Sequence, residues 1–116
     1  MAVRERSEQR DLFPGSLEIM ILQSLRRQPM HGYALAQHIK RQSAELVLVE
    51  EGSLYPALQR LLQQNHVKAS WQISSTGRKV RTYQLTPRGV LHLERELSLF
   101  KRMLKGITLV LSPAKL

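Results

Sequence analysis

Residues 52–89 read GSLYPALQRLLQQNHVKASWQISSTGRKVRTYQLTPRG, and these 38 residues contain no aspartate or glutamate. The first part predicts a helix from about Gly52-Ser53 to Gln64, because its four leucines recur at helical spacing. Pro56 is expected in the first turn, where its missing N–H costs no hydrogen bond. The inner side of this helix is expected to hold Leu54, Leu58, Leu61 and Leu62, and the outer side Pro56, Gln59, Arg60 and Gln63.

The second part of the stretch predicts a β-hairpin. Apolar residues from Val67 to Ile73 alternate with polar ones, which is the period of a half-buried strand. A Ser-Thr-Gly turn follows, and residues 79–86 return as a second strand. In this interpretation Trp71 faces the core, and the hairpin tip carries the cations Arg78 and Lys79.

Two shorter helices are expected before this stretch. Ser16 is a plausible N-cap for the first, which is apolar on most sides and ends before Pro29. The second begins at His31-Gly32 and runs to about Gln42. The β-branched segment 46–49 is either a minimal strand or a buried linker. Two short helices, a third helix and a basic hairpin form the pattern of a winged helix-turn-helix.

A long helix is expected after the hairpin. Thr86 is a good N-cap, Pro87 a good first residue, and Pro113 ends the helix. Apolar residues repeat along it at alternating spacings of three and four, the register of a coiled-coil seam. Because the helix is longer than one small domain needs, we expect this seam to form a homodimer. The register residues are Val90, Leu93, Leu97, Phe100, Leu104, Ile107 and Leu111.

The charge is concentrated in the same stretch. The whole chain has 116 residues, 18 Lys and Arg and 9 Asp and Glu, a net charge of +9. Residues 52–89 hold six cations, whereas residues 1–51 are neutral overall. A carboxylate in this stretch would face phosphates if its partner were nucleic acid, so the pattern favours duplex DNA.

Several functional classes are disfavoured. The absence of cysteine excludes disulfides and Cys-ligated metal sites. No apolar stretch is long enough for a membrane span, and residues 1–11 do not resemble a signal peptide. Neither a phosphate loop nor a catalytic constellation is recognisable. We therefore expect a cytoplasmic, non-enzymatic protein with no cofactor, no metal and no membrane partner.

Each part of the stretch has an expected role on DNA. Ser53, with the free N–H groups at its helix start, and Tyr55 are candidates for phosphate contacts. Side chains with donor and acceptor groups suited to base edges are Gln59, Arg60 and Gln63. Arg78, Lys79 and Arg81 are expected to contact the flanking backbone or the minor groove.

Four runs in this sequence resemble the PadR family of bacterial transcriptional regulators. They are Pro14-Gly15-Ser16-Leu17-Glu18, His31-Gly32-Tyr33, Gly52-Ser53-Leu54-Tyr55-Pro56-Ala57-Leu58 and Tyr83-Gln84-Leu85-Thr86-Pro87-Arg88-Gly89. The resemblance covers about residues 13–110. Within the family, the chain resembles the short subfamily, which has one C-terminal helix. It implies a winged-helix homodimer that represses by operator binding, often relieved by a small aromatic or hydrophobic effector. By motif it places Ser53 and Tyr55 at the start of the recognition helix and Gly77-Arg78 on the wing.

The sequence thus predicts an α+β fold, mainly α: a winged helix-turn-helix with a long C-terminal dimerisation helix. Its parts are a flexible arm (1–13), a DNA-binding domain (14–86) and the dimerisation helix (87–116). The predicted function is a homodimeric repressor of a palindromic operator. An effector pocket could lie at the dimer interface around Trp71. The alternative is a winged-helix adaptor that contacts a protein and does not bind DNA.

Overall fold

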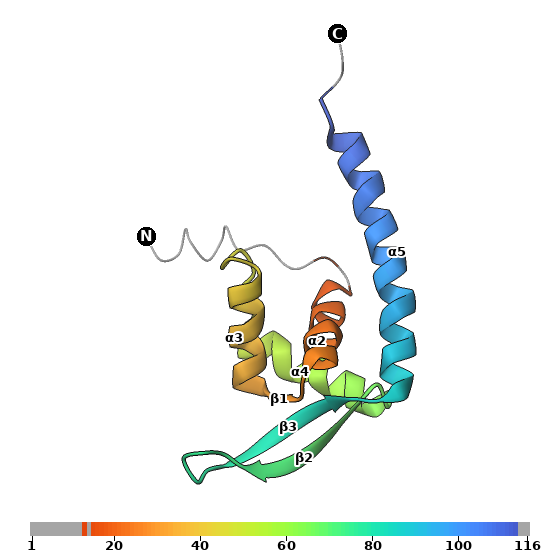
Figure 1. Ribbon diagram of the computed structural model, residues 1–116. Coiled ribbons are helices and arrows are strands. Elements are labelled where there is room, and N and C mark those ends of the chain that lie inside the picture. Colours follow the sequence, from red (N-terminus) through yellow and green to blue (C-terminus); the bar gives the residue numbers. More distant parts are fainter. Residues whose placement is uncertain (1–12, 14, 114–116) are drawn as a thin grey trace.

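The computed structural model describes residue 13 and residues 15–113, so the predicted arm falls, apart from Phe13, outside the described residues. Over this part the chain forms four helices and a three-stranded antiparallel sheet in the order β1-β3-β2, which confirms the mainly α winged-helix fold (Figure 1). The elements are α2 (Ser16–Arg27), β1 (Met30–His31), α3 (Gly32–Gln42), α4 (Glu51–Gln63), β2 (Val67–Ile73), β3 (Lys79–Leu85) and α5 (Pro87–Leu111).

Helix α2 is the central element of the core. It contacts α3, α4, α5 and β3, as its broad apolar surface predicts. The cap of α2 differs from the prediction, because the N-cap is Gly15 in a left-handed conformation (φ 80°) and not Ser16. Ser16 is the first helical residue, and its hydroxyl donates to the Phe13 carbonyl at 2.7 Å. A glycine suits the capping position because it adopts positive φ without steric cost.

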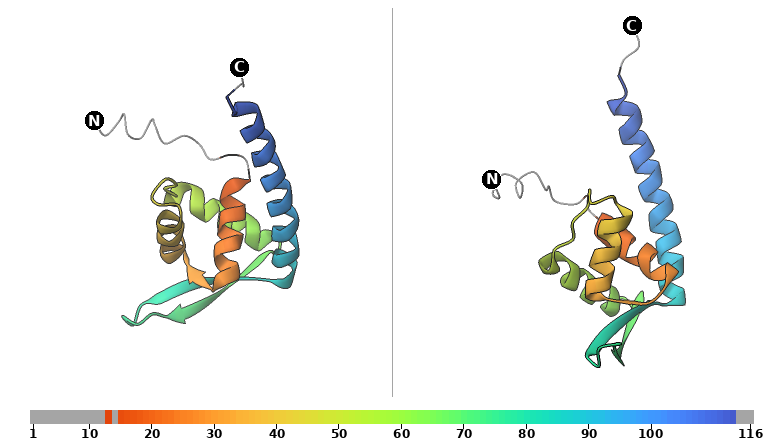
Figure 2. Two further views of the ribbon diagram at one scale, coloured as in Figure 1. Left: turned by 45° about the horizontal axis from the view of Figure 1, so that its top comes forward. Right: turned by 60° about the vertical axis from the view of Figure 1, so that its left-hand side comes forward.

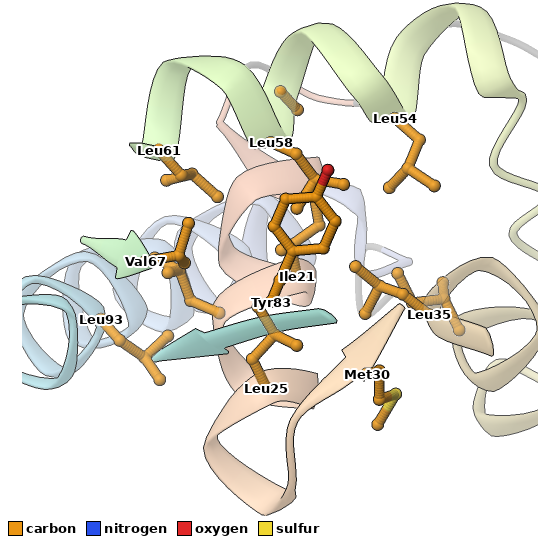
Figure 3. Close-up of a cluster of buried hydrophobic side chains, with 13 residues drawn as sticks. Ile21, Leu25, Met30, Leu35, Leu54, Leu58, Leu61, Val67, Tyr83 and Leu93 are labelled. Atoms are coloured by element: carbon orange, nitrogen blue, oxygen red, sulfur yellow. The ribbon is translucent and has the colours of Figure 1, made fainter. Parts of the chain in front are cut away.

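The core lies between α2, α4 and the sheet. Figure 3 shows Ile21 of α2 near the leucines of α4 and Leu25 farther from them, with the Tyr83 ring pointing from β3 towards Leu58. Leu93 of α5 is fully buried in the same cluster. The long helix therefore shares the core of the winged domain over its first turns.

The sheet contains one strand that the sequence pattern did not predict. The two-residue strand β1 pairs Met30 with Tyr83 and His31 with Thr82, and so closes the sheet against the first two helices. The hairpin itself is confirmed, with β2 and β3 in register from Val67↔Leu85 to Ile73↔Lys79. Its distal half projects away from the helices (Figures 1 and 2).

The predicted inward orientation of Trp71 is wrong. The side chain is 62% exposed, and Ile73 is 70% exposed. Both belong to the same alternating set as Val67, which is buried. The alternation therefore identifies the correct face of the strand. Side chains on that face pack against the core only near the base of the hairpin.

Two boundaries around α4 also differ from the prediction. The helix starts at Glu51, because the Glu50 carbonyl already accepts hydrogen bonds from the N–H groups of Ser53 and Leu54. Pro56 consequently lies inside the helix and not in its first turn. Segment 46–49 is neither a strand nor a buried linker as a whole, since Leu46 is 82% exposed and only Val47 and Val49 pack on the core.

Helix α5 is attached firmly to the end of α4. The Thr86 hydroxyl accepts a hydrogen bond from the Gly89 N–H at 2.9 Å, which confirms Thr86 as the N-cap. The same hydroxyl donates to the Asn65 carbonyl at 2.7 Å, and the Thr86 N–H donates to the His66 carbonyl at 3.1 Å. From this joint α5 runs beside α2 and continues past the rest of the domain (Figures 1 and 2).

Candidate nucleic-acid interface

One face of α4 is built from polar and cationic side chains. Its apolar residues Leu54, Ala57, Leu58 and Leu61 are buried against the core. This packing leaves Pro56, Gln59, Arg60 and Gln63 exposed on the opposite side, as predicted. The two glutamines offer both a donor and an acceptor, the combination that a base edge in the major groove requires.

Arg60 is not free on this face. Its Nε and Nη2 both donate to one carboxylate oxygen of Glu18 on α2, at 3.0 and 2.6 Å. Both side chains are partly exposed, so the pair contributes little to stability. It does bring a negative charge to the edge of a face whose own stretch of sequence has none.

The start of α4 carries two carboxylates, and its N–H groups are less open than predicted. Glu50 is the N-cap and Glu51 occupies the first turn, where carboxylates are favourable for the helix dipole. The Ser53 N–H is used within the helix, as it donates to the Glu50 carbonyl at 3.0 Å. Ser53 is nevertheless exposed, and its hydroxyl lies on the first turn of the helix.

Tyr55 connects α4 to the start of α3. Its ring lies against Gly32, where a Cβ would be 2.7 Å from the tyrosine hydroxyl oxygen. The side chain is still 44% exposed. Burial, together with the charge of Glu51 and the neighbouring Tyr83, raises the pKa of Tyr55. The phenol therefore keeps its proton and can donate a hydrogen bond to a phosphate oxygen.

The β2–β3 hairpin presents cations and apolar side chains together. Trp71 lies opposite Arg81 and Ile73 opposite Lys79, so all four side chains share one face. The Lys79 ammonium is 5.6 Å from the centre of the Trp71 ring. We call Trp71, Ile73, Lys79 and Arg81 the wing patch. Arg78 lies in the turn at the tip and follows Gly77, whose φ angle is 81°.

A stacked histidine pair, which no sequence pattern predicted, lies beside the joint of α4 and α5. The rings of His66 and His92 are parallel within 13° and 4.0 Å apart. His66 is buried, and its Nδ1 has no hydrogen-bond partner among the described residues. Burial, with His92 and the guanidinium groups of Arg88 and Arg95, lowers the pKa of His66. No group of three or more metal-ligating side chains occurs among the described residues.

The predicted dimer register divides into two parts. Leu93 is completely buried in the core of the chain and Leu97 packs on the same core, which is the packing expected of a helix on its own domain. Val90 and Phe100 are half-buried, whereas Leu104 and Ile107 are 37% and 39% exposed. Leu111 is 75% exposed, so the outer half of α5 leaves its apolar surface without a partner in the described chain.

A largely apolar cavity of about 680 Å³ lies where α2, α3 and α5 meet. Its lining includes Met20, Ile39, Leu97 and Phe100. Trp71 is not among its lining residues. The single tryptophan therefore does not belong to this cavity, although the last helix does.

A helix with an exposed amide face, followed by a cationic hairpin, defines a winged helix-turn-helix fold, a class in which many proteins bind DNA. The chain belongs to the PadR-like family: the sequence model of the "Transcriptional regulator PadR-like family" matches residues 21–95. It is thus a transcriptional regulator and not an enzyme. Within residues 15–113 no helix is long and apolar enough to cross a membrane.

Solved structures agree with this assignment. A transcriptional regulator from Clostridium thermocellum superposes with a TM-score of 0.77 at 23% identity, over 84% of this chain and 95% of that one. A PadR-like transcriptional regulator from Bacillus cereus gives a TM-score of 0.74 at 26% identity, over 86% and 95%. Bacillus subtilis PadR, solved with operator DNA, gives 0.63 at 24% identity, over 71% of this chain and 46% of that one. At these identities the first and third comparisons show the fold alone.

Proposed function

We propose that this chain is a homodimeric repressor that binds a palindromic operator through α4 and the β2–β3 wing. The observation that carries the proposal is the exposed surface of these two elements. Beyond Glu51 at the start of α4, this surface presents amides and cations, and no residue from 52 to 89 is acidic. The complex of Bacillus subtilis PadR with operator DNA supports a DNA partner for this fold.

The side chains divide by the part of the duplex that they contact. Ser53 in the first turn of α4 and Tyr55 in the second bind phosphate, while Gln59 and Gln63 contact base edges in the major groove. Arg60 contributes only after it leaves Glu18, because a salt-bridged guanidinium has little charge to offer a phosphate. Cations of the wing contact the flanking backbone or the minor groove, namely Arg78, Lys79 and Arg81.

Residues 87–116 serve as the dimerisation helix and residues 14–86 as the DNA-binding domain. The exposed apolar surface of outer α5 supports this division, since Leu104, Ile107 and Leu111 are 37%, 39% and 75% exposed in the described chain. A two-fold dimer presents two α4 helices to two half-sites, which accounts for a palindromic operator.

A small aromatic or hydrophobic effector releases the operator in this proposal. The apolar cavity between α2, α3 and α5 supports such a ligand, and its walls include the helix assigned to the dimer. An effector that enters this cavity changes the position of α5 relative to α2. Binding of the effector is detected by a raised midpoint of thermal unfolding and by release of bound duplex. If every member of a broad panel of planar apolar compounds leaves both readouts unchanged, the effector part of the proposal is wrong.

Binding to the chain's own upstream promoter across a salt series tests the central proposal. Affinity should fall linearly with the logarithm of salt concentration, because each phosphate contact releases counterions. Affinity that does not change with salt would contradict the proposal. A failure to retard any duplex, with a stable protein complex recovered from cells, would favour the adaptor function instead.

A further inference from the structure

The wing patch has an apolar component that a purely electrostatic wing does not need. Trp71 is 62% exposed and Ile73 is 70% exposed, and they lie two residues apart on one face of β2. Large apolar side chains in water carry an unfavourable hydration free energy that is recovered only on burial. Nothing in the described chain covers them, because the hairpin projects beyond the helices (Figure 2).

The charges around these two side chains determine what can cover them. Lys79 and Arg81 lie directly opposite Ile73 and Trp71, and Arg78 follows at the tip. A partner must therefore combine apolar surface with negative charge. A second copy of this chain offers little negative charge, because three of the six carboxylates in its described part are in ion pairs with its own cations. Duplex DNA combines both properties, as it has apolar deoxyribose edges beside each phosphate.

We propose that Trp71 and Ile73 make apolar contacts with deoxyribose and base edges in the minor groove that flanks the base pairs contacted by α4. This inference rests on the proposed function. Only residues 64–66 separate α4 from β2, so the wing begins beside the recognition helix. Apolar side chains that enter a minor groove are a known means of holding DNA. Lys79, close to the Trp71 ring, places its charge beside the same groove.

Intrinsic fluorescence gives a direct test, because Trp71 is the only tryptophan in the chain. A duplex of about 30 base pairs from the chain's own promoter region is titrated into the full-length protein, enough for two half-sites one helical turn apart. The emission of Trp71 should change and should saturate at the Kd measured by anisotropy of the same duplex carrying a fluorescent label. Protein concentration alone, without DNA, should leave the emission unchanged.

Substitutions separate the apolar contact from the electrostatic one. Trp71→Ala should weaken binding roughly tenfold at every salt concentration and leave the salt slope unchanged, because it removes apolar area and no charge. Lys79→Ala should instead reduce the salt slope by about one. Leu91→Ala is the matched control, since Leu91 is 71% exposed but lies on α5, and it should bind as the wild type does.

The outcomes are distinguishable. If the duplex binds but the emission of Trp71 does not change, or if Trp71→Ala binds like the wild type, the wing-patch inference is overturned and operator binding stands. If emission changes with protein concentration and not with DNA, the patch contacts a second copy and the inference is wrong. If no duplex binds at any salt concentration, the proposed function and this inference both fail.

Discussion

Gly32 and Tyr55, from two different helices, are in contact so close that a single added carbon on Gly32 would lie 2.7 Å from the Tyr55 hydroxyl oxygen. Gly32 is the first residue of α3, and Tyr55 lies on the exposed side of α4. The contact thus sets where the tyrosine hydroxyl stands on the proposed phosphate-binding surface. It also explains why a glycine occupies a helical position that other residues would fill more stably.

Gly32→Ala should lower the free energy of unfolding by about 1 kcal/mol, because the added Cβ displaces the Tyr55 ring. The double-mutant cycle is the decisive measurement. In a Tyr55→Ala background the same substitution should become neutral or stabilising, because the clash is gone and alanine is the better helix former. If Gly32→Ala lowers the free energy of unfolding equally in both backgrounds, the contact with Tyr55 is not the cause of the destabilisation.

Two other glycines of the chain form a matched pair on one helix. A Cβ on Gly89 would clash with the His66 carbonyl oxygen, which is backbone and cannot move aside cheaply, whereas a Cβ on Gly106 would meet nothing within 4 Å. We expect Gly89→Ala to destabilise the protein by roughly 3 kcal/mol. Gly106→Ala should stabilise it by about 0.5–1 kcal/mol. Thermal and urea unfolding of the two variants measure the difference, and similar values for both would contradict it.

Removing the charge of Glu18 should strengthen DNA binding. In Glu18→Gln the Arg60 guanidinium loses its salt bridge and a negative charge leaves the edge of the α4 face. Affinity for promoter DNA should rise severalfold and the salt slope should steepen by up to about one. Stability should change by less than about 1 kcal/mol. Glu94→Gln, which breaks the comparable Arg26 pair, is the control and should leave DNA binding unaltered.

The outer half of α5 is the appropriate place to test the proposed dimer. Leu97 packs on its own core, so a lysine there would harm the protomer itself. Ile107→Lys with Leu111→Lys should give a folded monomer by light scattering, because these side chains are exposed and lie on the predicted seam. Leu109→Lys, equally near the helix end but off the seam, should remain dimeric. A double variant that stays dimeric would place the interface elsewhere.

Stability should decline as the pH falls below neutrality. Burial lowers the pKa of both His66 and His38 below 6.5, so the unfolded chain binds protons at a higher pH than the folded one. The stabilisation is therefore complete above about pH 6.5 and is lost as the pH falls towards the folded-state values. Urea unfolding between pH 8 and 5 measures this loss. In the variant with both histidines changed to glutamine, the free energy of unfolding should depend markedly less on pH. If its pH dependence equals that of the wild type, His38 and His66 are not its source.

Local patterns predicted the elements well but not the contacts between distant segments. The leucine spacing of α4, the alternation of the hairpin and the Thr86 cap are properties of neighbouring residues, and all are confirmed. Strand β1 is only two residues long and exists because Met30 pairs with Tyr83, 53 positions away. No window of sequence contains that information.

The same limit affected the candidate site. Residues 52–89 contain no acid, yet Glu18 of α2 forms a salt bridge with Arg60. The charge around the α4 face in the folded structure therefore differs from the charge of its stretch of sequence. Trp71 shows a second form of this limit. Alternation identified its face of the strand, but its exposure depends on how far the helices extend over the hairpin, which is a property of the whole fold.

One side chain joins the end of α4 to the start of α5, since the Thr86 hydroxyl bonds to both the Asn65 carbonyl and the Gly89 N–H. In a two-fold dimer, the separation of the two recognition helices then depends on the angle at which α5 leaves this joint. Over the roughly 37 Å of α5, a tilt of about 5° displaces one end by about 3 Å relative to the other. A ligand that altered only how two α5 helices cross would thereby move α4 out of step with the helical repeat of DNA, without touching any residue that faces the operator.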